Sequence, residues 1–431
     1  MRKIFILLLL VYCSVSYAQS HPGLRVQGRY LYDRAGERII LRGANAMIVF
    51  WDRDGAINYP ELSKTGANCC RIFWRTGHAP EPVLPAADLD ETIQNCIDNK
   101  MIPLISVWDA TGDWSHLQTC VDYWTRADVS AVLRKHEKYL LLNIANEAGG
   151  DVVGQTEFRQ QYTSAINQIR NAGIHVPLII DADRWGRNGD VLNENGPYLL
   201  EQDPDHNLVF SWHLWDPTNW GNGSKTAIRR IIDGSIEKNI CLIVGEFGPI
   251  EFGDNPNSGK INWDYLIEYA AEKEIGWLAW VWNWSDYHSI VKRSSGKYGD
   301  WANAPWGENI AVASPYSIQQ TAKRPHWLET GLDRTLLETY HYSLQQNYPN
   351  PFNPVTKIEF TISQKTFVRL TIYNILGHAV KSLFSEFKEP GDYSVNWEAT
   401  DDSGSPVAVG LYYCSLTTDN FGQVRKMLYL K

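Results

Sequence analysis

The segment YLLLNIANE (139–147) is an apolar run that ends in an asparagine and a glutamate. Seven comparable runs occur up to residue 284, and consecutive runs begin 31 to 38 residues apart. Most are continuously apolar rather than alternating, which is typical of parallel strands buried on both faces. The other seven runs are IILRGANAM (39–47), CRIFW (70–74), IPLISVWD (102–109), PLIIDADRW (177–185), LVFSWHLW (208–215), CLIVGEFG (241–248) and GWLAWVWNW (276–284).

Helix-like stretches separate several of these runs, at 88–99, 157–172, 225–238 and 262–274. Eight buried strands alternating with helices predict an α/β fold, a (β/α)8 TIM barrel. The alternative, a doubly wound open sheet, would usually carry a glycine-rich phosphate turn after its first strand. The first run continues as Arg42-Gly43-Ala44-Asn45 and has no GxGxxG pattern, so the barrel is favoured. Catalytic residues are then expected at the C-terminal ends of the strands.

The composition excludes several classes of function. The chain has 431 residues, with 40 Lys and Arg against 49 Asp and Glu, and a net charge of −9. Because there is no run of cations, nucleic acid is not an expected partner. The cysteines show neither a CxxC pair nor a zinc-like spacing to histidines, so we expect no metal and no other cofactor. The 18 Trp residues are a large number, and flat indole faces often hold flat ligands.

Residues 1–18, MRKIFILLLLVYCSVSYA, combine two cations, a short apolar run and small terminal residues, which predicts a secretory signal peptide. We therefore expect a protein exported through the periplasm, either secreted or attached to the cell surface. The barrel domain would occupy residues 19–328, and a monomer is expected. Cys69 and Cys241 lie in apolar strand-like runs and are expected to be buried thiols rather than bridged.

Two glutamates stand at strand ends, Glu147 and Glu246. A buried carboxylate is costly unless it is paired or hydrogen-bonded, so a purely structural role is awkward. Paired carboxylates with aromatic walls indicate cleavage of a glycosidic bond, in which one carboxyl protonates the leaving oxygen and the other attacks or stabilises the sugar. A metal-dependent barrel hydrolase would require several histidines, often as HxH on the first strand, and the first run has none.

Several motifs resemble glycoside hydrolase family 5 of clan A. The clearest are NIANE (143–147) and IVGEFG (243–248), accompanied by Arg71, His213 and Trp282. Other segments resemble the bacterial β-mannanase branch of that family: RGANAM (42–47), TGANCCRI (65–72), VWDATG (107–112), GEFGP (245–249), GWLAWVWNW (276–284) and PWGENI (305–310).

This resemblance covers roughly residues 24–328 and implies a retaining double displacement. Glu147 would be the acid/base and Glu246 the nucleophile, with carboxyl groups ~5–5.5 Å apart. Arg71 would keep Glu246 ionised, and Asn146 would bind the sugar 2-hydroxyl.

Aromatic and imidazole side chains would complete the substrate site. The resemblance implies that His213 and Trp282 form the −1 subsite, with Trp282 as a stacking floor. Trp108, Trp185 and Trp215 are further candidates for stacking on sugar rings, because they follow strands. The family usually has histidine where this chain has Trp108 and tyrosine where it has Trp215, so the hydrogen bonding around the −1 sugar must differ.

The composition changes near residue 329, where a polar linker (329–344) leads into QQNYPNPFNP (345–354). Short alternating runs then predict a small all-β, Ig-like sandwich over residues 345–431. The expected strands are KIEFTI (357–362), FVRLTIYN (367–374), YSVNWEA (393–399), GLYYCSL (410–416) and VRKMLYL (424–430).

This C-terminal segment resembles the type A sorting domain of the type IX secretion system. NYPNPFNP, IYNILG (372–377), PGDYSVNW (390–397), GLYYCSL and the final KMLYLK carry the resemblance. It implies that the tail is recognised by the type IX secretion machinery. A carbohydrate-binding module is the alternative, but Trp397 is the only tryptophan in this segment.

These observations predict a secreted retaining endo-β-1,4-glycanase that hydrolyses β-mannan. An endo-β-1,4-glucanase of the same family is the first alternative, because mannose and glucose differ only at C2. The second is a surface protein that binds polysaccharide without cleaving it.

Overall fold

The computed structural model describes residues 23–77, 83–219, 221–253, 257–330, 342–362, 366–388, 391–418 and 421–430. It divides into two compact units, one ending at Glu329 and the other beginning at Thr330. The predicted signal peptide (1–18) and most of the predicted linker (329–344) lie outside the described residues. Among the helices in the described ranges, none is long and apolar enough to cross a membrane.

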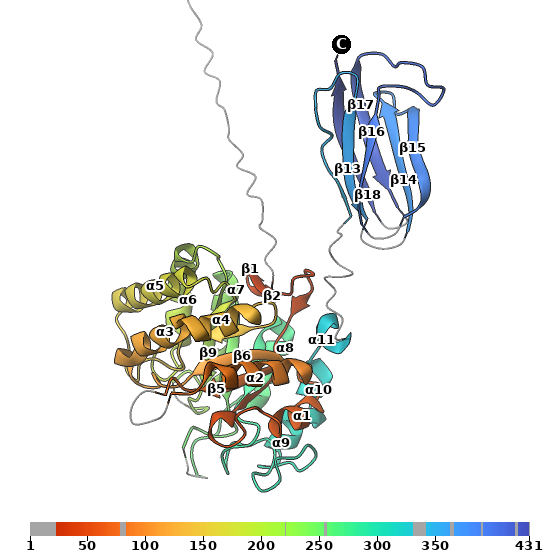
Figure 1. Ribbon diagram of the computed structural model, residues 1–431. Helices are drawn as coiled ribbons and strands as arrows, with labels where there is room; N and C mark the ends of the chain where they lie inside the picture. The colour runs from red at the N-terminus through yellow and green to blue at the C-terminus, as the bar shows by residue number, and fades with distance from the viewer. Residues whose placement is uncertain are drawn as a thin grey trace, which may run out of the picture. The chain divides into compact units, whose positions relative to one another are not determined.

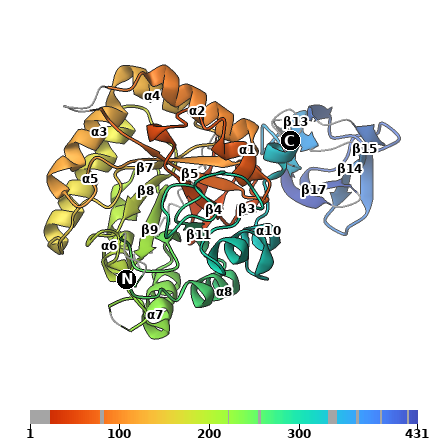
Figure 2. The ribbon, with the colours of Figure 1, turned by 90° about the horizontal axis from the view of Figure 1, so that it is seen from below.

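Eight parallel strands form a closed barrel in the first unit (Figures 1 and 2). Strand order follows the chain, and β11 closes the ring by pairing with β4, with Leu278 opposite Gly43. Every residue of these strands is buried, and each strand falls within one of the eight apolar runs except that β5 begins one residue earlier, so the predicted TIM barrel is confirmed. The strands are β4 (Arg42–Ala46), β5 (Cys69–Trp74), β6 (Ile102–Val107), β7 (Leu141–Asn143), β8 (Leu178–Asp181), β9 (Leu208–Leu214), β10 (Leu242–Phe247) and β11 (Gly276–Ala279).

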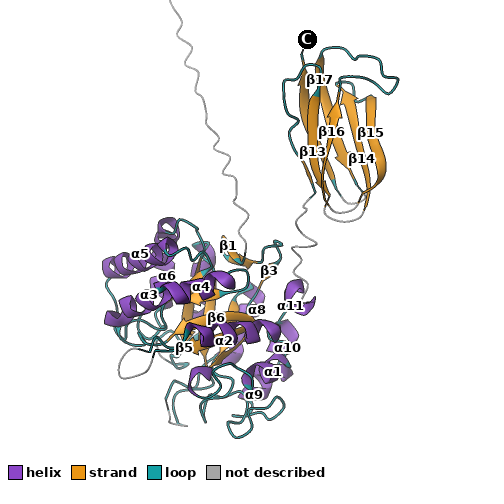
Figure 3. Ribbon diagram, in the orientation of Figure 1, coloured by secondary structure: helices purple, strands orange, loops and turns teal. Residues whose placement is uncertain are grey.

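Helices surround the barrel (Figures 2 and 3). The four predicted helices are present as α2 (Ala86–Asp98), α5 (Gln155–Asn171), α7 (Lys225–Glu237) and α8 (Trp263–Lys273). The sequence patterns do not predict α3, α4 or α6; α6 contains Pro197 and two glycines, which usually indicate a loop, yet it packs between α5, α7 and β9. The remaining helices and helical turns are η1 (Ile48–Phe50), α1 (Asn58–Ser63), η2 (Trp114–His116), α3 (Leu117–Thr125), α4 (Ala127–Lys135), α6 (Gly189–Gln202), α9 (Trp306–Glu308), η3 (Asn309–Ala313), α10 (Ile318–Thr321) and α11 (His326–Thr330).

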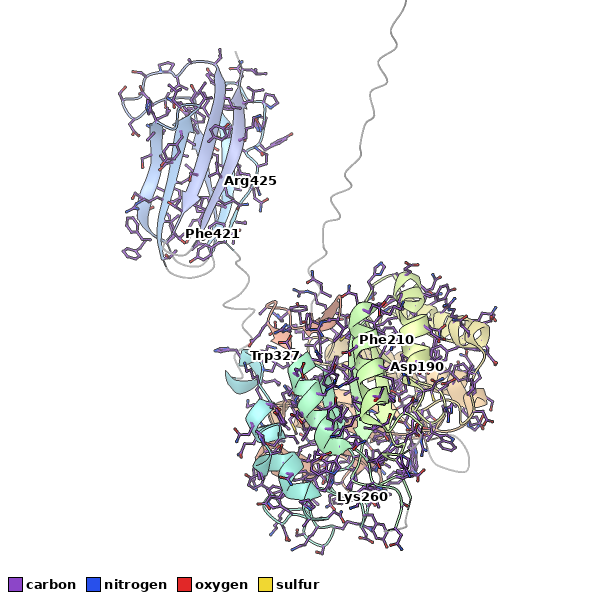
Figure 4. All side chains as sticks on the ribbon, turned by 180° about the vertical axis from the view of Figure 1, so that it is seen from behind. Asp190, Phe210, Lys260, Trp327, Phe421 and Arg425 are labelled. Atoms are coloured by element: carbon purple, nitrogen blue, oxygen red, sulfur yellow. The ribbon has the colours of Figure 1, made fainter. Side chains whose placement is uncertain are left out.

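The N-terminal end of the barrel is closed by an apolar layer. A small antiparallel sheet of β1 (Arg25–Gln27), β2 (Tyr30–Tyr32) and β3 (Arg38–Ile39) precedes the barrel. Its Leu31 joins a buried cluster with side chains from the first halves of the strands, and Trp327 of α11, labelled in Figure 4, belongs to the same cluster. The polar part of the interior therefore lies toward the C-terminal strand ends.

The six cysteines in the described residues are all buried and free. This confirms the expectation of buried thiols at Cys69 and Cys241.

The second unit is a sandwich of two antiparallel sheets, ordered β12-β13-β16 and β15-β14-β17-β18, as predicted. The sequence patterns miss β12, which is only two residues long, and β15, whose side chains are all exposed or half-buried. Trp397 is 1% exposed and packs in the sandwich core, so it offers no binding face. Arg425, labelled in Figure 4, donates to the Leu344 carbonyl at 2.7 Å and ties the two sheets together. The strands are β12 (Ser343–Leu344), β13 (Thr356–Ile362), β14 (Thr366–Asn374), β15 (Ala379–Lys388), β16 (Gly391–Trp397), β17 (Gly410–Thr417) and β18 (Gly422–Tyr429).

Candidate active site

A layer of polar side chains fills the barrel next to the apolar layer, on the side of the C-terminal strand ends. Side chains two residues apart on a strand point to the same face, so Arg71 follows Cys69 into the interior and Asp181 follows Ile179. All members of the layer are at most 1% exposed, and buried polar groups of this kind persist only when hydrogen-bonded. The layer consists of Arg71, Ser106, Asn143, Asp181 and Ser211.

Arg71 is the centre of this layer. Its Nη1 donates to Glu246 Oε1 at 2.5 Å and to Asn45 Oδ1 at 3.1 Å. Its Nη2 donates to Asn146 Oδ1 at 2.7 Å and to Asp181 Oδ2 at 3.1 Å. The rigid guanidinium fork suits several fixed acceptors at once, whereas lysine would present a single point charge. Arg71 thus brings Glu246 and Asn146, from different strands, to one point.

Glu246 lies in β10 at a register shift against β9. Its Oε1 accepts from Arg71, and its Oε2 accepts from the indole Nε1 of Trp215 at 3.2 Å. Burial raises the pKa of Glu246 to about 7, and the charge of Glu147 acts in the same direction, whereas His213 and Arg71 oppose the rise. Both of its oxygens are held by donors, which fixes the carboxylate plane.

Glu147 follows β7 and has a left-handed backbone with φ of +42°. This conformation is strained for a residue with a side chain. Its N–H donates to Asp181 Oδ2 at 3.0 Å, and its carbonyl accepts from the Gly112 N–H at 3.0 Å, so the turn is held from two sides. Burial raises the pKa of Glu147 to about 8, Asp181 adds to the rise, and Arg71 and Arg187 oppose it. Glu147 therefore retains its proton at neutral pH.

His213 lies in β9, is fully buried, and contacts the acid. Its Nδ1 is 2.6 Å from Glu147 Oε1, and its Nε2 is 3.2 Å from Ser211 Oγ. Burial lowers the pKa of His213, which favours the neutral imidazole. Gly186 is required beside it, because a Cβ at that position would lie 2.5 Å from the ring and its φ is +72°.

The two carboxylates form a close pair. One oxygen of Glu147, one oxygen of Glu246 and one nitrogen of His213 all lie within 4.8 Å of one another. Retaining glycosidases place their carboxyl groups ~5–5.5 Å apart, whereas inverting enzymes need ~6.5–9.5 Å to admit a water. One oxygen of each carboxyl therefore lies closer to the other than the separation that an inverting enzyme needs.

The same three donors could geometrically surround a metal ion. However, Glu246 Oε1 already accepts from the Arg71 cation at 2.5 Å, and a second cation there would be repelled. The donor set therefore suits proton transfer better than metal binding.

The predicted tryptophans divide into two groups. Trp108 and Trp185 are 38% and 46% exposed, so their indoles can contact a ligand. Trp282 and Trp215 are 0% and 2% exposed, because both pack in apolar clusters at the strand ends. The expectation that these two offer stacking surfaces is therefore corrected. Trp215 instead turns its N–H to Glu246.

Aromatic side chains from three different loops meet at the mouth of the barrel. Phe50 lies 5.2 Å from Trp108 and 5.1 Å from Trp284 between ring centroids. Phe50 and its neighbour Trp51 are 37% and 43% exposed. These rings form an apolar surface at the mouth of the barrel that suits the C–H faces of sugars.

Trp185, in the loop after β8, is fixed against glycines. A Cβ added to Gly112 would lie 2.2 Å from the Trp185 indole, and a Cβ added to Gly150 would lie 2.8 Å from it. The backbone N–H of Trp185 donates to the Gly149 carbonyl at 3.1 Å. Close packing on two glycine-bearing loops holds the ring beside the Glu147 turn.

Of the polar layer, the sequence patterns identify only Arg71, and they do not identify the exposed Phe50. Asp181, Asn143 and Ser106 each interrupt an apolar run two residues after an interior position, and that spacing could have identified them. Phe50 follows the first strand in a helical turn that no sequence pattern predicts.

A barrel with two unequal carboxylates within 4.8 Å at its strand ends, and exposed aromatic rings around them, defines a glycoside hydrolase. Residues 33–286 match the family described as "Cellulase (glycosyl hydrolase family 5)", and the chain belongs to this family. Residues 354–422 match the FlgD Ig-like domain, in agreement with the sandwich.

Known relatives agree with this assignment. A mannan endo-1,4-β-mannosidase of Salipaludibacillus agaradhaerens is 30% identical over 313 residues, which cover 70% of this chain and 94% of that protein. The solved β-mannanase of Thermomonospora fusca is 28% identical with a TM-score of 0.63, covering 71% of this chain and 99% of that one. An endoglucanase of Clostridium saccharobutylicum is 21% identical over 291 residues, covering 65% of this chain and 62% of that protein.

Proposed function

We propose that the protein is an endo-β-1,4-mannanase that hydrolyses β-mannan with retention of configuration. The observation that carries the mechanism is the unequal environment of the two carboxylates. Glu246 accepts from a cation and an indole N–H, whereas Glu147 contacts an imidazole whose neutral form is favoured by burial. Burial raises both pKa values above the ordinary 4.5, but the two donors on Glu246 favour its carboxylate form, whereas Asp181 adds to the rise at Glu147. This difference in environment supports Glu246 as the nucleophile and Glu147 as the acid.

In the first step, the Glu246 carboxylate attacks the anomeric carbon while the glycosidic C–O bond breaks. The proton of Glu147 moves to the leaving oxygen, and the sugar remains as an ester on Glu246. In the second step, Glu147 takes a proton from water as the water attacks the same carbon. Glu246 then leaves as a carboxylate and Glu147 is again protonated.

Asn146 is oriented to bind the sugar. Its Oδ1 accepts from Arg71, and its Nδ2 donates to Thr111 Oγ1 at 2.8 Å. An amide nitrogen has two hydrogens, so one is left for the substrate 2-hydroxyl. A donor at this hydroxyl strengthens its contact in the transition state.

The preference for mannan is supported by the two β-mannanase relatives with 28% and 30% identity. Because the endoglucanase relative has the same family fold, an endo-β-1,4-glucanase is the second candidate. The full chain should be assayed for reducing-sugar release from mannan, galactomannan, glucomannan and carboxymethyl-cellulose. Faster hydrolysis of cellulose than of mannan would reject the mannanase proposal but keep the mechanism. NMR of the first product on a short β-mannoside should show the β-anomer, and an α-anomer would reject retention.

We also propose that the protein is exported and that residues 345–431 direct it through type IX secretion. The resemblance of the tail motifs supports this proposal, and the Ig-like sandwich of the second unit agrees with it. The test is expression in a bacterium that has this machinery, with and without residues 345–431. Equal export of both forms would reject the proposal.

A further inference from the structure

Trp215 lies at the centre of a cluster of aromatic rings on the nucleophile's side of the barrel mouth. Its ring centroid is 5.3 Å from Phe252, 5.6 Å from His288 and 6.3 Å from Trp280, with interplanar angles of 71°, 87° and 83°. Edge-to-face contacts of this kind have a preferred direction, unlike simple apolar burial. We name Trp215, Phe252, Trp280 and His288 the aromatic clamp.

The other members of the aromatic clamp also contact one another. Phe252 stacks on His288 with centroids 5.8 Å apart and an angle of 24°, and it lies 6.0 Å from Trp280. The His288 ring is anchored in turn, with Nδ1 3.0 Å from Ser285 Oγ and Nε2 3.4 Å from the Glu251 carbonyl. The clamp is therefore a connected set of rings rather than a chance contact.

The backbone around the clamp leaves little room for Trp215 to move. A Cβ on Gly248 would lie 2.8 Å from Trp215 Cζ3 and 3.0 Å from His288 Cδ2. Only glycine at this position allows both rings to approach the chain. Trp215 is 2% exposed, whereas Phe252 above it is 56% exposed, so Phe252 is the outermost ring.

The indole N–H of Trp215 has one use in this arrangement, which is the 3.2 Å hydrogen bond to Glu246 Oε2. An indole nitrogen is a donor that neither accepts nor ionises, so it favours the carboxylate over the acid. We propose that Phe252 and His288 are positioning residues that hold this N–H on Glu246 and so keep the nucleophile oriented for attack. The kinetic part of this inference rests on the proposed function.

The competing explanation is that Phe252 touches only the substrate, since it is largely exposed. A double-mutant comparison separates the two. Phe252→Leu removes the ring, Phe252→Tyr restores it, and Trp215→Phe removes the N–H but keeps an aromatic side chain. Phe387→Leu, at a phenylalanine of the other unit that is also more than half exposed, is the matched control and should leave kcat unchanged.

If Phe252 acts through Trp215, Phe252→Leu lowers kcat about threefold to tenfold, with little change in KM. The acidic limb of the kcat/KM profile moves to higher pH, because Glu246 loses an aligned donor. Phe252→Tyr restores both values. In the Trp215→Phe background, Phe252→Leu has no further effect. The charged and titratable groups facing Glu246 are Arg71, Glu147, Asp181 and His213, and all are retained in these variants.

Equal effects of Phe252→Leu in both backgrounds, or an effect on KM alone, would overturn the proposal. A readout without substrate keeps it separate from the proposed function. The pH titration of the fluorescence difference between wild type and Trp215→Phe reports ionisation beside Trp215. The same difference is then measured between Phe252→Leu and the Phe252→Leu/Trp215→Phe double variant. The midpoint of this second titration should lie at higher pH, and an unmoved midpoint would also overturn the proposal. Inactivity of the wild type on every glycan would reject only the proposed function.

Discussion

Replacing Glu147 by glutamine should stabilise the barrel at neutral pH while abolishing hydrolysis. The pKa of Glu147 rises from its ordinary value of 4.5 to about 8 because the folded protein buries it. Between these two values the unfolded chain loses the proton and the folded chain keeps it. The stability contributed by this carboxyl is therefore fully present below pH 4.5 and is lost as pH rises through the folded pKa. Glutamine imitates the protonated acid and avoids this loss.

The size of the effect follows from the shift. At pH 7 the unfolded carboxyl is ionised and the folded one is mostly protonated. With 1.36 kcal/mol per pKa unit, Glu147→Gln should be more stable than wild type by about 2 to 4 kcal/mol at pH 7. The two proteins should have equal stability near pH 4. Glutamine keeps the shape and can still contact His213, so no cavity opposes the gain.

Denaturant unfolding followed by tryptophan fluorescence provides the assay, because all 18 Trp except Trp397 precede the tail. The barrel can thus be followed in the full chain at pH 4, 5.5, 7 and 8. Glu194→Gln, at an exposed glutamate of α6, is the matched control and should show no such pH-dependent gain. If Glu147→Gln and wild type gave parallel stability curves, burial would not be acting on Glu147 as argued. Hydrolysis of polysaccharide by Glu147→Gln should fall by about a hundredfold or more.

Three other substitutions test the site. Arg71→Lys keeps the positive charge but loses the guanidinium fork, so kcat/KM should fall by at least about tenfold. The acidic limb of the kcat/KM profile should also move to higher pH, because Glu246 loses a hydrogen-bond donor. An unchanged pH profile would contradict the role of Arg71. Gly186→Ala should displace His213 and reduce both kcat and stability, the latter by about 1 to 3 kcal/mol in denaturant unfolding, whereas wild-type values would show that the ring has room to move. Trp185→Ala should raise KM on long substrates about threefold to tenfold with kcat nearly unchanged, and Michaelis kinetics with an unaltered KM would exclude it as a sugar contact.

The strands were predictable because barrel strands are buried on both faces, which leaves an uninterrupted apolar run. The helices were less so. α6 has the turn residues Gly189, Gly196 and Pro197, yet tertiary packing against α5, α7 and β9 keeps it helical. β15 was missed because it lies at the sheet edge and has no buried face to produce alternation.

The candidate catalytic pair could be found from sequence because a carboxylate at the end of an apolar run is conspicuous. The partners of that pair could not be found in the same way. Asp181 accepts a hydrogen bond from the backbone N–H of Glu147, 34 residues earlier in the chain. Arg71 and its acceptor Glu246 are 175 residues apart. Such contacts depend on the closure of the ring of strands, which no local pattern encodes.

The sequence alone therefore determined the architecture, the positions of Glu147 and Glu246 and the excess of tryptophan, since these follow from local composition and spacing. The tertiary structure decided what each tryptophan does. Trp215 and Trp108 both follow strands. Trp215 is enclosed by Phe252, Trp280 and His288, whereas Trp108 remains exposed at the mouth of the barrel. Burial depends on which distant loops meet above a strand end, and only the folded chain brings those loops together.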